Sequence, residues 1–137
     1  RYQEASDNAE KLAQWLSKQK SIDRIIYPGL KSHPQNEIAK RQQLTPNGNI
    51  IYGNMISIDL GNKESRDTFL NHLELFTLAE SLGGVESLVC VPFNMTHAAV
   101  PIETKLEMGI TESLIRLSIG IENFEDLKSD LSKALEL

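Results

Sequence analysis

Residues 113–120 read Ser-Leu-Ile-Arg-Leu-Ser-Ile-Gly, and this stretch carries most of the fold prediction. Apolar and polar side chains alternate along it, and a period of two indicates a β-strand that buries only one of its faces. The residues on the buried face would be Ile115, Leu117 and Ile119. Arg116 would then project away from the core, near the end of a strand that Gly120 terminates.

Further strands and helices are predicted on both sides of this stretch. A second alternating segment runs from Tyr52 to Leu60, and shorter strand candidates lie at 23–27, 76–79 and 88–91. Apolar spacing and end signals predict helices at about 5–16, 37–43, 102–108 and 124–135, and another around 69–73. This interleaving predicts an α+β fold, a two-layer sandwich whose mainly antiparallel sheet carries helices on one face. The other face would need water or a partner.

The composition of the chain restricts its class. Its 137 residues suit one domain with a real core, and its net charge of −5 without a basic stripe disfavours nucleic acid as a partner. No apolar run approaches the roughly 20 residues of a membrane span. Cys90 is the single cysteine, so no internal disulfide is possible and we expect a reducing, cytoplasmic setting. The start at Arg1, without a methionine, suggests a piece of a longer polypeptide.

Two places carry side chains that could bind a ligand. Arg116 offers a planar guanidinium that matches a carboxylate, although a solvated strand arginine is the commoner reading of the residue alone. The stretch Ala79 to Ser87 contains two adjacent glycines, with Glu80 and Ser81 at the rim of the bend that they would form. This bend could equally be structural, because no glycine-rich phosphate motif is present.

Metal binding is not expected from this sequence. The three histidines, His33, His72 and His97, are widely separated, and the residues around them do not resemble a zinc site. No grouping of serine, histidine and acid indicates a hydrolase. The residues alone therefore predict a soluble α+β domain with one face able to receive an anion.

Taken in order along the chain, these segments resemble a known family of enzymes. The matching motifs are Tyr27-Pro28-Gly29-Leu30, Ser32-His33-Pro34, Phe76 to Leu88, Met95-Thr96-His97 and Leu114 to Glu122. They are similar to the carboxy-terminal domain of the fold-type-I pyridoxal-phosphate enzymes of cysteine and methionine metabolism. Within that family the resemblance is strongest to cystathionine gamma-lyase and cystathionine gamma-synthase.

The resemblance implies roles for four residues. The arginine of the Ile-Arg-Leu-Ser motif, here Arg116, binds the α-carboxylate of the amino-acid substrate in this family. Ser81 would help to hold the same carboxylate, and Glu80 would line the distal part of the pocket and influence which sulfur amino acid reacts. Thr96 is implied as a residue of the pocket rim. The strand alternation places Arg116 on the open face independently of the resemblance.

The resemblance also implies pyridoxal phosphate, bound mainly by a large domain that these 137 residues do not include. Residues 1–137 would be the substrate-side domain, with no catalytic residue and no metal of their own. Thr104-Lys105 superficially resembles the family's cofactor-lysine dipeptide, but it follows Pro101 in a helical stretch, so we reject it. The isolated chain is expected to be inactive, and the intact enzyme is expected to be a homotetramer.

The expected reaction of the intact enzyme converts cystathionine to cysteine, 2-oxobutanoate and ammonia. Glu80 suits the gamma-lyase and the gamma-synthase better than the beta-lyase, and Val91-Pro92 with His97 to Val100 favours the gamma-lyase. Phe93 departs from the small residue common at its position. The gamma-synthase or a related sulfur amino-acid lyase is the alternative enzyme, and a stand-alone amino-acid-sensing or assembly module is the alternative without catalysis.

Overall fold

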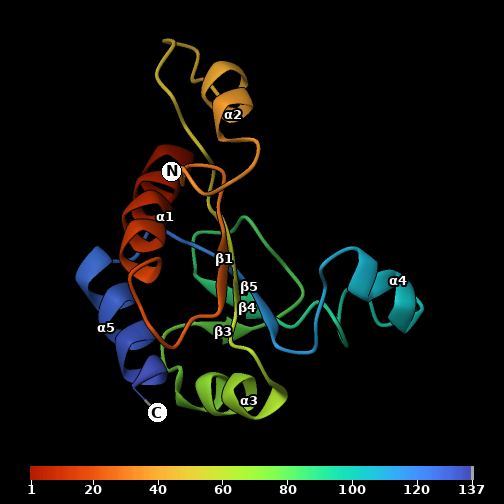
Figure 1. Ribbon diagram of the computed structural model, residues 1–137. Helices are drawn as coiled ribbons and strands as arrows, with labels where there is room; N and C mark the ends of the chain where they lie inside the picture. The colour runs from red at the N-terminus through yellow and green to blue at the C-terminus, as the bar shows by residue number, and fades with distance from the viewer. Residues whose placement is uncertain (137) are drawn as a thin grey trace.

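The computed structural model describes residues 1–136, in which five helices surround a five-stranded sheet (Figure 1). The strands are β1 (Arg24–Ile26), β2 (Met55–Asp59), β3 (Thr77–Leu78), β4 (Leu88–Cys90) and β5 (Leu114–Ser118). The helices are α1 (Tyr2–Leu16), α2 (Asn36–Gln42), α3 (Lys63–His72), α4 (Ile102–Glu107) and α5 (Phe124–Leu135). Every predicted element exists, with ends that differ by a few residues.

The sheet has the order β1-β2-β5-β4-β3, so the strand predicted from residues 113–120 lies at its centre. Neighbouring strands are antiparallel except β3 and β4, which are parallel. This arrangement confirms the predicted α+β class with a mainly antiparallel sheet. The predicted strand at 76–79 contracts to two exposed residues at the sheet edge, where pairing on one side supports little strand structure.

One face of the sheet is packed against α1, α3 and α5 (Figure 1). The fully buried strand residues on this face include Ile56, Ile58, Ile115, Leu117 and Ile119. The helices contribute Leu12 and Leu16 from α1, Phe69 from α3, and Leu127 and Leu131 from α5. This core confirms the alternation argument, because burial of apolar area supplies the main favourable free energy of folding.

The other two helices lie outside this core, with α4 on the far side of the sheet from α1 and α5 (Figure 1). The expectation of a bare second face was therefore wrong in part, because Leu88, Leu114 and Ser118 on that face are buried. Asp59 of β2 fixes the segment that follows α4. Its carboxylate accepts hydrogen bonds from the Thr111 and Ser113 hydroxyls.

Candidate anion-binding site

Arg116 lies where the alternation of β5 predicts, on the face of the sheet opposite α1 and α5. Its neighbours Ile115 and Leu117 are fully buried in the core, whereas Arg116 is half-buried. Across the sheet it pairs with Ser57 on β2 and Cys90 on β4. The central position of β5 holds the backbone of Arg116 by strand pairing on both sides.

Within residues 1–136, the carbonyl oxygen of Glu80 is the one backbone acceptor of the Arg116 guanidinium. Its Nη2 donates to the carbonyl oxygen of Glu80 at 3.1 Å, and this bond joins the end of β5 to the bend at residues 79–87. Within residues 1–136, no acidic side chain forms an ion pair with Arg116. A guanidinium carries five N–H donors, so Arg116 retains donors for an incoming anion. An internal ion pair therefore does not occupy this guanidinium within residues 1–136.

Cys90 is the cross-strand neighbour of Arg116 and is buried. Burial raises the pKa of the Cys90 thiol, because a thiolate is poorly solvated there, and the positive charge of Arg116 only partly opposes this effect. The thiol is therefore protonated at neutral pH. A buried, protonated thiol of this kind contributes to packing and is a poor nucleophile.

The bend at residues 79–87 presents Glu80 and Ser81 to solvent. Gly83 has a φ of +77°, a left-handed conformation that favours glycine, and its N–H donates to the Ser118 hydroxyl at 2.8 Å. The structure thus brings Arg116, Glu80 and the adjoining Ser81 to one place. The double glycine is a structural bend, and that bend carries two of the predicted site residues.

Thr96 lies in the segment between β4 and α4, and no hydrogen bond in the described part of the chain joins it to Arg116 or the bend. Its hydroxyl is 2.8 Å from Nδ1 of the neighbouring His97. The side chain is exposed. Its predicted place on a pocket rim stays a prediction.

Lys105 is a buried lysine that holds the same segment. Its amine donates to the carbonyl oxygens of Phe93 at 2.7 Å and Ala98 at 3.4 Å, and it lies 4.3 Å from the centre of the Phe93 ring. An amine engaged in this way is not available to bind a cofactor, which agrees with the rejection of Thr104-Lys105 as a cofactor motif. No periodic pattern in the sequence indicates this contact.

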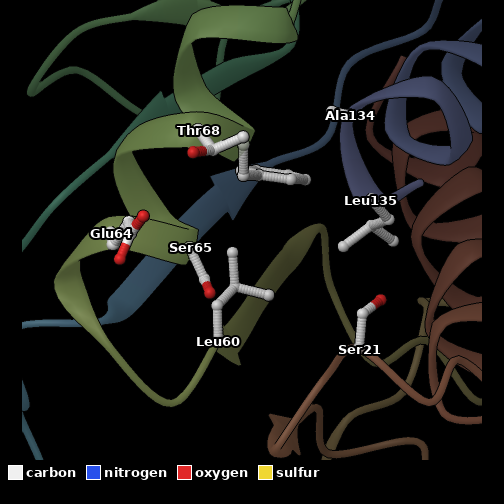
Figure 2. Close-up of a pocket in the computed structure, with 8 residues that line it drawn as sticks. Ser21, Leu60, Glu64, Ser65, Thr68, Ala134 and Leu135 are labelled. Carbon is white, nitrogen blue, oxygen red and sulfur yellow. The ribbon is translucent and has the colours of Figure 1, made fainter. Parts of the chain in front are cut away.

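A pocket of about 300 Å³ lies elsewhere, where α3 faces the end of α5 (Figure 2). Its lining residues are Ser21, Leu60, Glu64, Ser65, Thr68, Phe69, Ala134 and Leu135. None of the predicted site residues lines it, and the lining contains no cation that could bind a carboxylate. The candidate site is therefore the open surface around Arg116.

Residues 1–136 contain neither a metal-ligand cluster nor a membrane-spanning helix. No group of three or more histidine, cysteine, aspartate or glutamate side chains has a geometry that could hold a metal ion. None of the helices in that range is long and apolar enough to cross a membrane.

Comparison with known proteins bears on the origin of this site. Cystathionine gamma-lyase of Bacillus subtilis (strain 168) is 48% identical over 136 residues, which are 99% of this chain and 34% of that protein. Cystathionine beta-lyase of Lactococcus lactis subsp. cremoris (strain MG1363) is 49% identical over 131 residues, 96% of this chain and 33% of that protein. The chain thus spans about a third of the length of these relatives.

The fold has a close counterpart among solved structures. Cystathionine gamma synthase from Xanthomonas oryzae pv. oryzae, in complex with cystathionine, superimposes with a TM-score of 0.90 and 42% identity, over 99% of this chain and 34% of that one. The family model described as "Cys/Met metabolism PLP-dependent enzyme" matches residues 1–136. This chain therefore belongs to the pyridoxal-phosphate-dependent enzyme family of cysteine and methionine metabolism.

Proposed function

We propose that residues 1–137 form the substrate-side domain of a cystathionine-cleaving enzyme and that Arg116 binds the α-carboxylate of the substrate. The observation that carries this proposal is the half-buried guanidinium on the open face, which has one backbone acceptor and no ion-pair partner in residues 1–136. Charge-assisted hydrogen bonds to a carboxylate contribute roughly 1.5–3 kcal/mol each. A fixed carboxylate orients the Cα–H bond for removal of its proton.

The other predicted site residues have subsidiary roles in this proposal. Ser81 donates its hydroxyl to the same carboxylate, a role supported by its place next to Glu80, whose carbonyl oxygen accepts from Arg116. Glu80 projects into the distal part of the substrate site and acts on the choice of sulfur amino acid. Thr96 belongs to the rim of the site.

The pyridoxal phosphate of this family fits the described residues only in part. Arg116 and Ser81 suit the carboxylate side of a site, whereas the buried amine of Lys105 is occupied by two carbonyl oxygens. We therefore assign attachment of the cofactor to a large domain outside this chain. When bound, the cofactor supplies an electron sink for the charge that develops at Cα.

The proposed reaction is γ-elimination of cystathionine to cysteine, 2-oxobutanoate and ammonia. Relatives named gamma-lyase and beta-lyase are about equally identical to this chain, so similarity alone does not choose between them. The acidic Glu80 at the bend supports the gamma-lyase or the gamma-synthase over the beta-lyase, and Val91-Pro92 with His97 to Val100 supports the gamma-lyase. Product analysis separates the reactions, since β-elimination yields homocysteine and pyruvate, and a synthase joins cysteine to an acylated homoserine.

The test is Arg116→Ala in the intact polypeptide that contains this chain. We expect KM for cystathionine to rise by roughly 10- to 100-fold, consistent with loss of one charge-assisted bond, with a smaller change in kcat. Arg41→Ala is the matched control, because Arg41 is exposed on α2 and makes no ion pair within residues 1–136. An unchanged KM in Arg116→Ala would show that Arg116 does not bind the substrate carboxylate.

A non-catalytic alternative predicts a different result for this chain alone. A sensing module would bind cystathionine in a calorimetric titration, whereas half of an enzyme site would give no measurable heat. A cytoplasmic homotetramer with the large domain present is the assembly that we propose for the intact enzyme. Size-exclusion chromatography of the chain alone tests the assembly-module alternative.

A further inference from the structure

We infer that Glu122 is a positioning residue that holds the 79–87 bend against the end of β5 and so sets where Arg116 and Ser81 meet a carboxylate. This inference deepens the proposed function and rests on it. It concerns a cluster of three residues that follow or face the end of β5, Ser87, Gly120 and Glu122, which we call the clasp. None of the three was predicted as a site residue.

The Glu122 carboxylate binds the bend through two oxygens. Oε1 accepts from the backbone N–H of Ser87 at 2.6 Å, and Oε2 accepts from the Ser87 hydroxyl at 2.9 Å. The same hydroxyl accepts from the backbone N–H of Gly120 at 2.8 Å. Ser87 is fully buried, so these bonds are shielded from water and each is costly to break.

Gly120 allows the close approach that the clasp needs. A Cβ added there would collide with the carbonyl oxygen of Val85 and with the Glu122 carboxylate. In the native chain the next residue, Ile121, instead donates its N–H to Val85 at 2.9 Å. The end of β5 and the bend are therefore packed backbone against backbone.

The clasp is anchored from the opposite side by α1. Buried Asn8 donates from Nδ2 to the carbonyl oxygens of Gly120 at 3.2 Å and Glu122 at 3.0 Å. The backbone of Glu122 is thereby fixed to the core, and its side chain extends that restraint to the bend. A surface loop alone would not have such support.

The bend transmits this restraint to Arg116. One end of it is held at Ser87, its middle at Gly83 by the Ser118 hydroxyl, and its other end carries the Glu80 carbonyl oxygen that accepts from Arg116. Without the Glu122 carboxylate, the bend keeps its bonds at Gly83, Val85 and the Ser87 carbonyl oxygen but loses the restraint on the Ser87 N–H and hydroxyl, so it can shift relative to β5. Displacements of about 1 Å in a binding site can cost on the order of a hundredfold in rate.

A purely structural role for Glu122 predicts something different. The carboxylate would then only satisfy the buried N–H and hydroxyl of Ser87, since Glu122 forms no ion pair within residues 1–136. Its loss would lower stability and reduce activity by the same factor whether or not Arg116 is present. A positioning role requires that the effect depend on Arg116.

The experiment is a double-mutant cycle in the intact, pyridoxal-phosphate-loaded polypeptide, with KM and kcat for cystathionine and a melting curve for each variant. Glu122→Ala removes both acceptors, and we expect KM to rise about tenfold with kcat changed less than about threefold. Glu122→Gln keeps one acceptor oxygen, and we expect it to restore most of the lost affinity. Glu125→Ala is the matched control at an exposed position three residues away.

The second half of the cycle adds Glu122→Ala to Arg116→Ala. We expect KM to change by less than about twofold there, because a displaced bend cannot weaken a contact that is already absent. An equal rise in both backgrounds, or no rise in either, overturns the inference and leaves the role of Arg116 standing. Arg116→Ala without effect overturns the proposed function and the inference together.

A second route keeps the test sound if Glu122→Ala does not yield folded protein. Ser87→Ala removes the hydroxyl that bridges Glu122 and Gly120 but keeps the backbone bond to Oε1. It enters the same cycle with Arg116→Ala, and we expect a rise in KM of about threefold that disappears in the double variant. A rise in KM of the same size in the double variant overturns the inference.

Discussion

The two faces of the sheet are stabilised in different ways. On the face that α1 and α5 cover, Ile58 and Ile115 pair across β2 and β5 and are fully buried. On the other face, their neighbours Ser57 and Arg116 pair with each other and are half-buried. Apolar packing is non-directional and holds the first face, whereas hydrogen bonds of defined geometry hold the segments on the second. Within this one pair of strands, the covered face therefore stabilises the fold, whereas the open face positions the segments around Arg116.

Substitutions of neighbouring residues on β2 should show the largest difference in stability between the two faces. Ile58→Ala removes buried methyl groups from the core, and we expect it to lower the free energy of unfolding by about 2–5 kcal/mol. Ser57→Ala changes a half-buried hydroxyl, and we expect a change within about 0.5 kcal/mol. Urea unfolding followed by circular dichroism measures both. Similar losses in the two variants would contradict the proposed division between the faces.

Asp59 tests whether hydrogen bonds alone hold a segment to the open face. Burial would raise the pKa of this carboxyl, but hydrogen bonds from Ser113, Thr111 and the Gly61 N–H, with the charge of Arg24, hold its pKa below the usual value. Its contribution to stability is therefore present above the unfolded-state pKa of roughly 3.9 and is lost as the pH falls through the folded-state pKa. We expect Asp59→Asn to cost about 2 kcal/mol at pH 7.

The pH dependence gives the control for that variant. We expect the cost of Asp59→Asn to shrink in acid, where the wild-type carboxyl is itself protonated, and unfolding curves between pH 7 and pH 2 follow this change. Glu37→Gln serves for comparison, because the pKa of Glu37 is also lowered, by its bond to Lys40, but the side chain is exposed. A constant cost of Asp59→Asn at every pH would assign its effect to packing.

Lys105 tests, with a smaller expected effect, whether side-chain hydrogen bonds restrain the segment at residues 91–101. Lys105→Met keeps the apolar stem but removes the amine that bonds to the Phe93 and Ala98 carbonyl oxygens. We expect a loss of about 1 kcal/mol and faster proteolytic cleavage in the segment at residues 91–101. Limited proteolysis with mass spectrometry locates the cuts. Cleavage at wild-type rate would mean that the amine does not restrain this segment.

Cys90 gives the smallest expected effect. Because burial raises the pKa of its thiol, we expect native protein at pH 7 to react with a thiol reagent at least about a hundred times more slowly than urea-unfolded protein. The rate of colour release with a disulfide reagent measures this ratio. Rapid native reaction would show that the thiol is exposed and would question the packing of the open face around Arg116.

The sequence predicted those features that repeat along the chain. The alternation of β5 correctly assigned Ile115 and Arg116 to opposite faces. The clasp and the Lys105 contact escaped prediction, because hydrogen bonds between distant residues leave no period in the sequence. The partial covering of the open face was missed for the same reason, because the hydrogen bond that holds the covering segment joins Thr111 to the distant Asp59.

The anchoring of the clasp by Asn8 has a consequence for synthesis of the protein. Asn8 and the Gly120 carbonyl oxygen are 112 positions apart in the chain. Contacts with so large a separation form late, because the closure of a long loop costs entropy before the contact can form. On a ribosome, Asn8 therefore cannot make this bond until residue 120 has emerged. The surface around Arg116 can acquire its final shape only after that point.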